Sequence, residues 1–173
     1  MLISGPVASG KTTLARGLAG RARAAGLPAA AIDMDEVIEM VAGSDWSRVH
    51  GTDRRRACRA TAPLVQSFFD SGLQVVAIAG STLSTYEWDE ITRRLDPAPD
   101  ILYVLLRVSV EQSVERTSHD PSRFHTRDPD FVEELAAAID WSKVRKPDLE
   151  VDTDGMTAEQ VLAHVAPKVG VPA

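Results

Sequence analysis

The chain has 173 residues, of which 44% are hydrophobic, and this is enough for one compact domain and too little for two. Its formal net charge of -6 disfavours a broad basic surface for nucleic acid or anionic membrane. A single cysteine cannot form an internal disulfide, and no apolar run approaches the ~18 residues of a membrane span. We therefore expect one domain over residues 1–173, in a reducing cytoplasm, with no membrane attachment and no extended nucleic acid partner.

Short apolar runs alternate with stretches of helical spacing along the whole chain. The apolar runs predict buried strands at residues 1–4, 28–33, 74–80, 101–106 and 149–152. The helical spacing predicts helices at residues 11–25, 35–41, 53–71, 85–95, 110–116, 130–142 and 157–169. Such alternation requires right-handed crossovers and places helices on both faces of a parallel sheet. We expect a three-layer α/β/α fold around a five-stranded parallel sheet, with ligands at the carboxyl ends of the strands.

Three local signals bear on the helix boundaries. Thr157 and Gln160 have the spacing of a capping box, which marks the start of the last helix. Gly26 follows the first helix, where a left-handed cap is favoured. Pro63 lies inside the predicted helix at residues 53–71, where it removes a hydrogen bond, so we expect a break near Ala62.

The segment GPVASGKT, residues 5–12, matches the phosphate-loop pattern G-x-x-x-x-G-K-[ST]. It follows a predicted strand and precedes a predicted helix, which is the context that the mechanism requires. Gly5 and Gly10 permit backbone conformations and a close approach that side chains would block. The backbone N–H groups expected to converge on the β-phosphate are those of Ala8, Ser9, Gly10 and Lys11.

The side chains that end the phosphate loop have distinct expected roles. Lys11 is expected to bridge the β- and γ-phosphates, and the Thr12 hydroxyl to ligate Mg²⁺. Thr13 is expected to reach the α-phosphate. The dipole of the following helix adds positive potential at the same place. The loop therefore predicts ATP or GTP, together with Mg²⁺, as cofactors.

Missing motifs separate the classes of phosphate-loop protein. A GTPase would carry an Asn-Lys-x-Asp base-recognition segment and an Asp-x-x-Gly segment after the third strand, and neither string occurs. A motor of the AAA or helicase type would end an apolar strand in an acidic pair, but the run at residues 74–79 is followed by Gly80, Ser81 and Thr82. This pattern favours a small kinase.

The second predicted strand ends in two aspartates, Asp33 and Asp35, at the edge that faces the phosphate loop. On an extended segment, carboxylates spaced by two point the same way. We assign Asp33 as the catalytic base or holder of a Mg²⁺ water and Asp35 as a hydrogen-bond partner of the acceptor, and the sequence leaves open which of them is the base. The alternative is structural, with Asp35 capping a helix and Asp33 solvated at a strand end.

These segments resemble the small-molecule phosphate-loop kinases, including chloramphenicol phosphotransferase and the shikimate, gluconate and adenylylsulfate kinases. MLISGPVASGKTTLARGL followed by AIDMDEVIEM is similar to chloramphenicol phosphotransferase, and the resemblance implies that Asp33 corresponds to its strand-end base. KPDLEVDTDGMTAEQVLAHV is similar to the end of adenylylsulfate kinases. That similarity implies that Thr153, Asp154 and Gly155 lie beside adenine.

The segment ERTSHDPSRFHTRD, rich in arginine and histidine and poor in apolar residues, is predicted to form a lid over about residues 117–129. The resemblance implies that Arg116 lies at or near adenine. It also implies that Arg123 and Arg127 reach the phosphates, with Arg123 stabilising the transferred group. The alternative is a solvated loop whose arginines pair with neighbouring acids.

The substrate-side region is expected at about residues 42–63, which contain the arginine-rich string DWSRVHGTDRRRACR. Arg56 is our candidate there for an anion-binding role in the acceptor site, although a charge run is also typical of a solvated helix face. Trp46, Tyr86 and Trp88 either line a pocket for an organic acceptor or belong to the core and its rim. The segment STLSTYEWDE lacks an early arginine that adenylylsulfate kinases present, which disfavours adenylylsulfate as the acceptor.

The hypothesis drawn from the sequence is an ATP-dependent phosphotransferase that acts on a hydroxyl group of a small molecule. The acceptor would be an antibiotic, a nucleoside-like compound or a sugar-like metabolite, and the role one in antibiotic resistance or biosynthesis. A nucleotide or polynucleotide kinase is the first alternative. A non-catalytic regulatory module that binds a nucleoside triphosphate is the second. The sequence does not indicate an oligomeric state.

Overall fold

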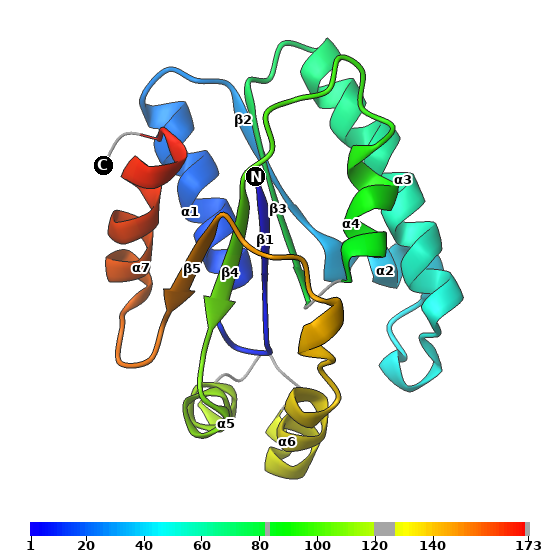
Figure 1. The fold of residues 1–173 in the computed structure, drawn as a ribbon, viewed down its shortest axis with the longest axis vertical. Coiled ribbons are helices and arrows are strands. Elements are labelled where there is room, and N and C mark those ends of the chain that lie inside the picture. Colours follow the sequence, from blue (N-terminus) through cyan, green and yellow to red (C-terminus); the bar gives the residue numbers. More distant parts are fainter. Residues whose placement is uncertain (82–83, 120–126, 172–173) are drawn as a thin grey trace.

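The computed structural model describes residues 1–81, 84–119 and 127–171, and in this part of the chain a five-stranded parallel sheet lies between two layers of helices (Figure 1). The strands are β1 Leu2–Gly5, β2 Ala29–Asp33, β3 Val75–Ser81, β4 Tyr103–Arg107 and β5 Leu149–Asp152. The α-helices are α1 Lys11–Ala24, α2 Met34–Ala42, α3 Gly51–Asp70, α4 Thr85–Thr92, α5 Val110–Ser118, α6 Pro129–Ala137 and α7 Ala158–Val165. The predicted fold class and the five strands are confirmed.

The strand order is β2-β3-β1-β4-β5, with all neighbours parallel, so β1 occupies the centre of the sheet. The register places Gly5 of β1 opposite Ser81 of β3, and Asp33 of β2 beside Ala79. The carboxyl ends of the three strands therefore meet at one edge. In Figure 1 this edge lies at the bottom of the sheet, on the side where α5 and α6 are found.

Each face of the sheet supports its own apolar core. Alternation along β1 sends Ile3 toward α1 and α7, and Leu2 toward α2, α3 and α4. Trp88 is fully buried in the second core and packs edge-on against Tyr103, with ring centroids 6.1 Å apart. Trp88 is therefore a core residue and does not line a pocket. In the described part of the chain, no helix is both long enough and apolar enough to span a bilayer.

Two of the three boundary signals are confirmed and one prediction is wrong. Thr157 and Gln160 form the capping box of α7, and Gly26 has a φ of 83° just after α1. The expected break at Pro63 is absent, because α3 continues through it from Gly51 to Asp70. Pro63 and Arg59, whose carbonyl loses its helical partner, both lie on the exposed face, so water can satisfy that carbonyl.

Because α3 is continuous, we expect Pro63→Ala to stabilise the protein. The substitution restores a backbone donor and removes a ring clash, which cost about 3 kcal/mol in a helix interior, while it also frees the unfolded chain by up to about 1 kcal/mol. The free energy of unfolding in urea should rise by roughly 1 to 3 kcal/mol. Ser67→Ala, at another exposed position of α3, is the control and should change it by less than about 0.5 kcal/mol. A lower free energy of unfolding for Pro63→Ala would contradict this account.

Candidate active site

The phosphate loop leaves β1 through a glycine that no other residue could replace without strain. Gly5 has a φ of 155°, and a Cβ there would lie 2.5 Å from the carbonyl oxygen of Leu106 on β4. Ala8 has a φ of 56°, and Gly10, which caps α1, has a φ of 93°. These three positive φ angles curl the loop around the start of α1.

No side chain caps the first turn of α1, so the N–H groups of that turn are available to an external anion. Lys11 Nζ donates a hydrogen bond of 2.6 Å to the carbonyl oxygen of Pro6, and Ser9 Oγ donates one of 2.9 Å to the same oxygen. Both contacts hold the loop in a closed curve. The Lys11 ammonium group lies over this curve, which suits the binding of phosphate groups.

Asp33 joins the phosphate loop to the second strand. Thr12 Oγ1 donates a hydrogen bond of 2.7 Å to Asp33 Oδ2, while Asp33 Oδ1 accepts one of 3.0 Å from the backbone N–H of Asp35. Asp33 is thus the N-cap of α2. The expectation that Asp33 and Asp35 both lie on an extended segment is wrong, because the chain becomes helical at Met34.

Asp35 lies in the first turn of α2 in a different environment. Ser81 Oγ, at the end of β3, donates a 3.3 Å hydrogen bond to Asp35 Oδ1. Burial raises the pKa of Asp35, and the negative charge of Asp33 raises it further, although Lys11, Ser81 and Arg54 act in the opposite direction. Asp35 is therefore a more basic carboxylate than a solvated aspartate.

The oxygen atoms of Thr12 and Asp33 fit a Mg²⁺ ion. Mg²⁺ prefers oxygen ligands and in kinases is held by one or two protein groups together with nucleotide phosphates and water. The described residues contain no group of three or more His, Cys, Asp and Glu side chains that could hold a metal ion alone. The chain thus offers part of a coordination shell, which bound phosphates would complete.

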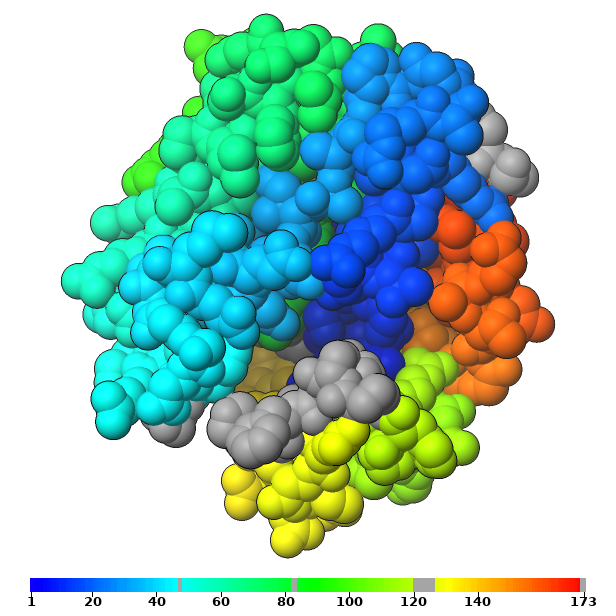
Figure 2. Space-filling model, turned by 180° about the vertical axis from the view of Figure 1, so that it is seen from behind, coloured from blue at the N-terminus to red at the C-terminus, as the bar shows by residue number. Residues whose placement is uncertain are grey.

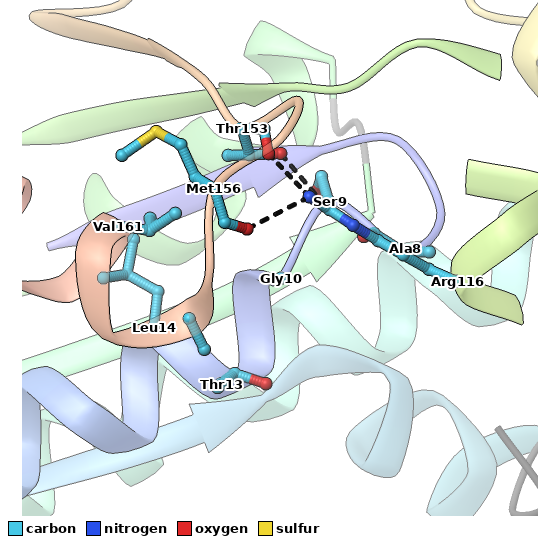
Figure 3. A pocket seen from close by; sticks show the side chains of 10 residues that line it. Ala8, Ser9, Gly10, Thr13, Leu14, Arg116, Thr153, Met156 and Val161 are labelled. Atoms are coloured by element: carbon cyan, nitrogen blue, oxygen red, sulfur yellow. Dashed lines mark hydrogen bonds between the residues drawn. The ribbon is translucent and has the colours of Figure 1, made fainter. Parts of the chain in front are cut away.

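A pocket of about 220 Å³ opens beside the phosphate loop, between α1, α5 and the segment that joins β5 to α7 (Figure 3). Leu14 and Val161 give it an apolar wall, while Thr13 lies at its loop side. Its lining residues are Ala8, Ser9, Gly10, Thr13, Leu14, Arg116, Thr153, Met156, Ala158 and Val161. An apolar slot next to a phosphate-binding loop suits a flat aromatic base.

Arg116 links the loop to the far side of this pocket. Its guanidinium donates to the carbonyl oxygens of Ala8 at 3.1 Å and Thr153 at 2.6 Å, and to Met156 at 3.5 Å (Figure 3). Thr153 Oγ1 also accepts from Arg116 at 3.2 Å. The structure therefore brings Arg116 and Thr153 together at the predicted base site. Gly155 lies in the same connecting segment, with a φ of 66°, but does not line the pocket.

The predicted lid lies largely outside the described residues. Arg123, the predicted catalytic arginine, falls within residues 120–126 and is therefore outside the described part of the chain. Arg127 is exposed and precedes α6. Helix α5 precedes the lid segment and α6 follows it. Both helices lie beside the carboxyl edge of the sheet (Figure 1).

On the substrate side, the structure brings Arg54 to the site and leaves Arg56 outside it. Arg54 Nε donates to Glu87 Oε1 at 3.0 Å, both side chains are mostly buried, and Arg54 lowers the pKa of Asp35. Arg56 is 70% exposed and pairs with Asp53 at 3.0 Å. Sequence reasoning missed Arg54 because three adjacent arginines give no signal of which one faces inward; only the helix phase decides it.

Comparison with known proteins gives a family match. A protein-family model described as "SKI: Shikimate kinase" matches residues 7–169 of the chain. No curated protein sequence gives a significant match.

Several solved structures share the fold at low sequence identity. A sugar kinase from Janibacter sp. HTCC2649 is 20% identical, with a TM-score of 0.70 over 98% of this chain and 93% of that chain. An APS kinase from Mycobacterium tuberculosis is 16% identical, with a TM-score of 0.68 over 98% and 96% of the two chains. A shikimate kinase from Acinetobacter baumannii is 19% identical, with a TM-score of 0.62 over 97% and 90%. At such identities the likeness establishes the fold.

We expect Asp35→Asn to stabilise the protein at neutral pH. Because the pKa of Asp35 is raised in the folded state, the folded protein disfavours its charged form, and stability is lost as the pH rises through that pKa. The melting temperature of Asp35→Asn should exceed that of the wild type at pH 7 to 8. The difference should vanish below about pH 4, near the ordinary pKa of aspartate. Asp100→Asn, an exposed control at the opposite edge, should show no such pattern, and equal melting temperatures at pH 8 would refute the prediction.

Arg116→Lys should weaken nucleotide binding. Lysine cannot reproduce a planar group that contacts three carbonyl oxygens, so the pocket wall would lose at least one charged hydrogen bond. We expect the Kd for ATP, measured by calorimetry, to rise by about tenfold, which corresponds to roughly 1.4 kcal/mol. Arg48→Lys, at an exposed arginine of the substrate side, serves as the control. Unchanged affinity in Arg116→Lys would mean that this arginine does not shape the pocket.

Proposed function

Since this chain belongs to the shikimate kinase family, we propose that it transfers the γ-phosphoryl group of ATP to a hydroxyl group of a small molecule, with Mg²⁺ as cofactor. One observation carries the proposal. The carboxyl edge of the sheet brings the phosphate loop, the Thr12–Asp33 hydrogen bond and the raised-pKa carboxylate of Asp35 into a single site. A donor phosphate, a cation and a base are the parts that such a transfer needs.

The two aspartates have separable roles in this proposal. Both oxygens of Asp33 are engaged, one by Thr12 and one by the N–H that starts α2, so Asp33 faces the nucleotide and its cation. We assign Asp35 as the base, because burial raises its pKa above that of a solvated aspartate. Asp35 takes the proton of the acceptor hydroxyl while that oxygen bonds to the γ-phosphorus and the bond to the leaving ADP oxygen breaks.

ATP is favoured as the donor over GTP. The pocket beside the phosphate loop is closed by Arg116 and Thr153 and walled by aliphatic side chains, which suits either purine base, so the choice of adenine rests on the sequence. The chain also lacks the Asn-Lys-x-Asp segment with which GTPases recognise guanine. In the proposed reaction, Arg123 and Arg127 of the lid segment would neutralise charge on the transferred group.

The class of acceptor is proposed from the site and from the names of structural neighbours. Neighbours include a sugar kinase, a gluconokinase and a shikimate kinase solved with shikimate, and sugars, gluconate and shikimate all carry hydroxyl groups. Another neighbour is a tunicamycin resistance protein from Deinococcus radiodurans, which keeps hydroxylated antibiotics among the candidates. The acceptor would lie beside Asp35, Ser81 and Arg54.

The proposal is tested by measuring ADP release with Mg²⁺ and ATP across panels of sugars, sugar acids, nucleosides and hydroxylated antibiotics. Lys11→Ala provides the blank, because it removes the ammonium group that in this proposal would contact the β- and γ-phosphates. A compound that stimulates ADP release in the wild type and not in the blank identifies the acceptor class. ATP binding without turnover on any panel would favour the regulatory module.

Once an acceptor is identified, Asp35→Asn and Asp33→Asn should change different kinetic parameters. Asp35→Asn should lower kcat by about 10² to 10⁴ with little change in the KM for ATP, and it should abolish the acid limb of the kcat/KM profile. Asp33→Asn should raise the Mg²⁺ and ATP concentrations needed for half-maximal rate. Asp100→Asn is the matched control. Full activity of Asp35→Asn, together with a large kcat loss in Asp33→Asn, would reverse the two assignments.

A further inference from the structure

The outer surface of α3 carries a hollow that belongs to neither side of the candidate active site. It has a volume of about 280 Å³ and is lined by Thr52, Arg55, Arg56 and Arg59, which we call the arginine hollow. Spacings of three, four and seven residues place these side chains along one stripe of the helix. Figure 2 shows the first turns of α3, in cyan, at the surface of the molecule.

The phase of α3 separates the arginine hollow from the acceptor side. Each residue of a helix turns the side-chain direction by about 100°, so Arg56 lies roughly 200° around the axis from Arg54. Arg54 points inward to Glu87, while Arg56 is 70% exposed. A ligand in the hollow would therefore not occupy the space beside Asp35.

Positive charge around the hollow exceeds the negative charge that pairs with it. Glu90, only 1% exposed, takes ion pairs from Arg59 at 3.1 Å, from Arg94 at 3.2 Å and from Arg93. Three guanidinium groups share this one carboxylate, which leaves a local surplus of positive charge around Glu90, and of the three Arg59 lines the hollow. The chain as a whole has a formal charge of -6, so this surplus is a local feature.

The remaining arginines of the hollow are available to a ligand. Within the part of the chain that the structure describes, the exposed guanidinium of Arg55 has no hydrogen-bond or ion-pair partner. Arg56 is paired only with Asp53, three residues away, at 3.0 Å. Exposed pairs of this kind contribute about 0 to 1 kcal/mol, so a multivalent anion can displace them readily.

We propose that the arginine hollow binds a chain of linked phosphate groups, the chemistry shared by nucleoside triphosphates and inorganic polyphosphate. Guanidinium groups match phosphate oxygens with two parallel hydrogen bonds. The stripe from Thr52 to Arg59 spans seven residues, or about 10 Å of helix, which exceeds the length of a single phosphate group. A linear polyanion can contact several of the arginines at once and so gains from their surplus charge.

Nitrogen-15 NMR of the wild-type protein tests the proposal, with sodium tripolyphosphate as the probe. Amide signals of residues 52–59 should shift and saturate along a single-site curve at 0.15 M salt, where charges more than about 8 Å apart are largely screened. Amides of residues 8–13 report the phosphate loop separately, so failure of the proposed active site and failure of the arginine hollow give different patterns.

Arg55→Gln with Arg56→Gln is the decisive variant, because neither arginine touches Glu90. It should weaken the titration at residues 52–59 by about tenfold or more and leave that at residues 8–13 unchanged, a difference of roughly 1.4 kcal/mol or more. Arg48→Gln is the control for loss of one surface charge near α3. Identical titrations in the double variant and the wild type, or shifts confined to residues 8–13, would overturn the proposal.

A parallel titration with ATP identifies the source of the phosphate chain. Equal shifts at residues 52–59 with ATP and tripolyphosphate would show that the linked phosphates suffice. Tighter binding of ATP would identify a nucleotide as the ligand, and tighter binding of tripolyphosphate would identify inorganic polyphosphate. Complete loss of the shifts between 0.02 and about 0.15 M salt would reduce the hollow to unspecific charge attraction and would refute the site.

Discussion

The hydrogen bond between Thr12 and Asp33 is the contact on which the arrangement of the candidate site depends. It joins two segments that are 21 residues apart, one at the start of α1 and one at the end of β2. Because the other oxygen of Asp33 caps α2, the same side chain fixes the phosphate loop and the direction in which α2 leaves the sheet. Asp35 is carried on the first turn of α2, so its distance from the loop is set through Asp33. One carboxylate thus connects the phosphate loop to the start of α2.

This connection explains why two aspartates two residues apart can have different chemistry. Asp33 has both of its oxygens engaged by donors, one by the hydroxyl of Thr12 and one by the backbone N–H of Asp35. Asp35 is buried beside that charge, and burial is the larger influence on its pKa. The burial that raises the pKa of Asp35 also disfavours its charged form in the folded protein.

Much of the fold followed from the sequence, since short apolar runs between helical stretches are a strong signal and each of the five strands was predicted. The phosphate loop could also be predicted, because local backbone geometry demands its glycines. Gly5 lies too close to the carbonyl group of Leu106 for any side chain. Features that depend on tertiary packing could not be predicted in the same way. The sequence marked Pro63 as a breaker, yet α3 passes through it because packing of the buried face outweighs one lost hydrogen bond on the exposed face. The extended geometry expected for Asp33 and Asp35 was also wrong. Asp33 both ends β2 and caps α2, so the chain is already helical at Asp35.

The three consecutive arginines of α3 show why composition alone could not assign the substrate side. Helical rotation directs Arg54 into the groove beside Glu87, where it is fixed by a carboxylate whose second oxygen caps α4. The same rotation carries Arg55 and Arg56 to the surface, near Arg59, which shares the buried carboxylate of Glu90 with Arg94. The three arginines are adjacent in the sequence, but they lie in two different environments, one mostly buried and one at the surface. Arg54, which points inward, lowers the pKa of Asp35, while Arg55 and Arg56 carry their positive charge at the surface.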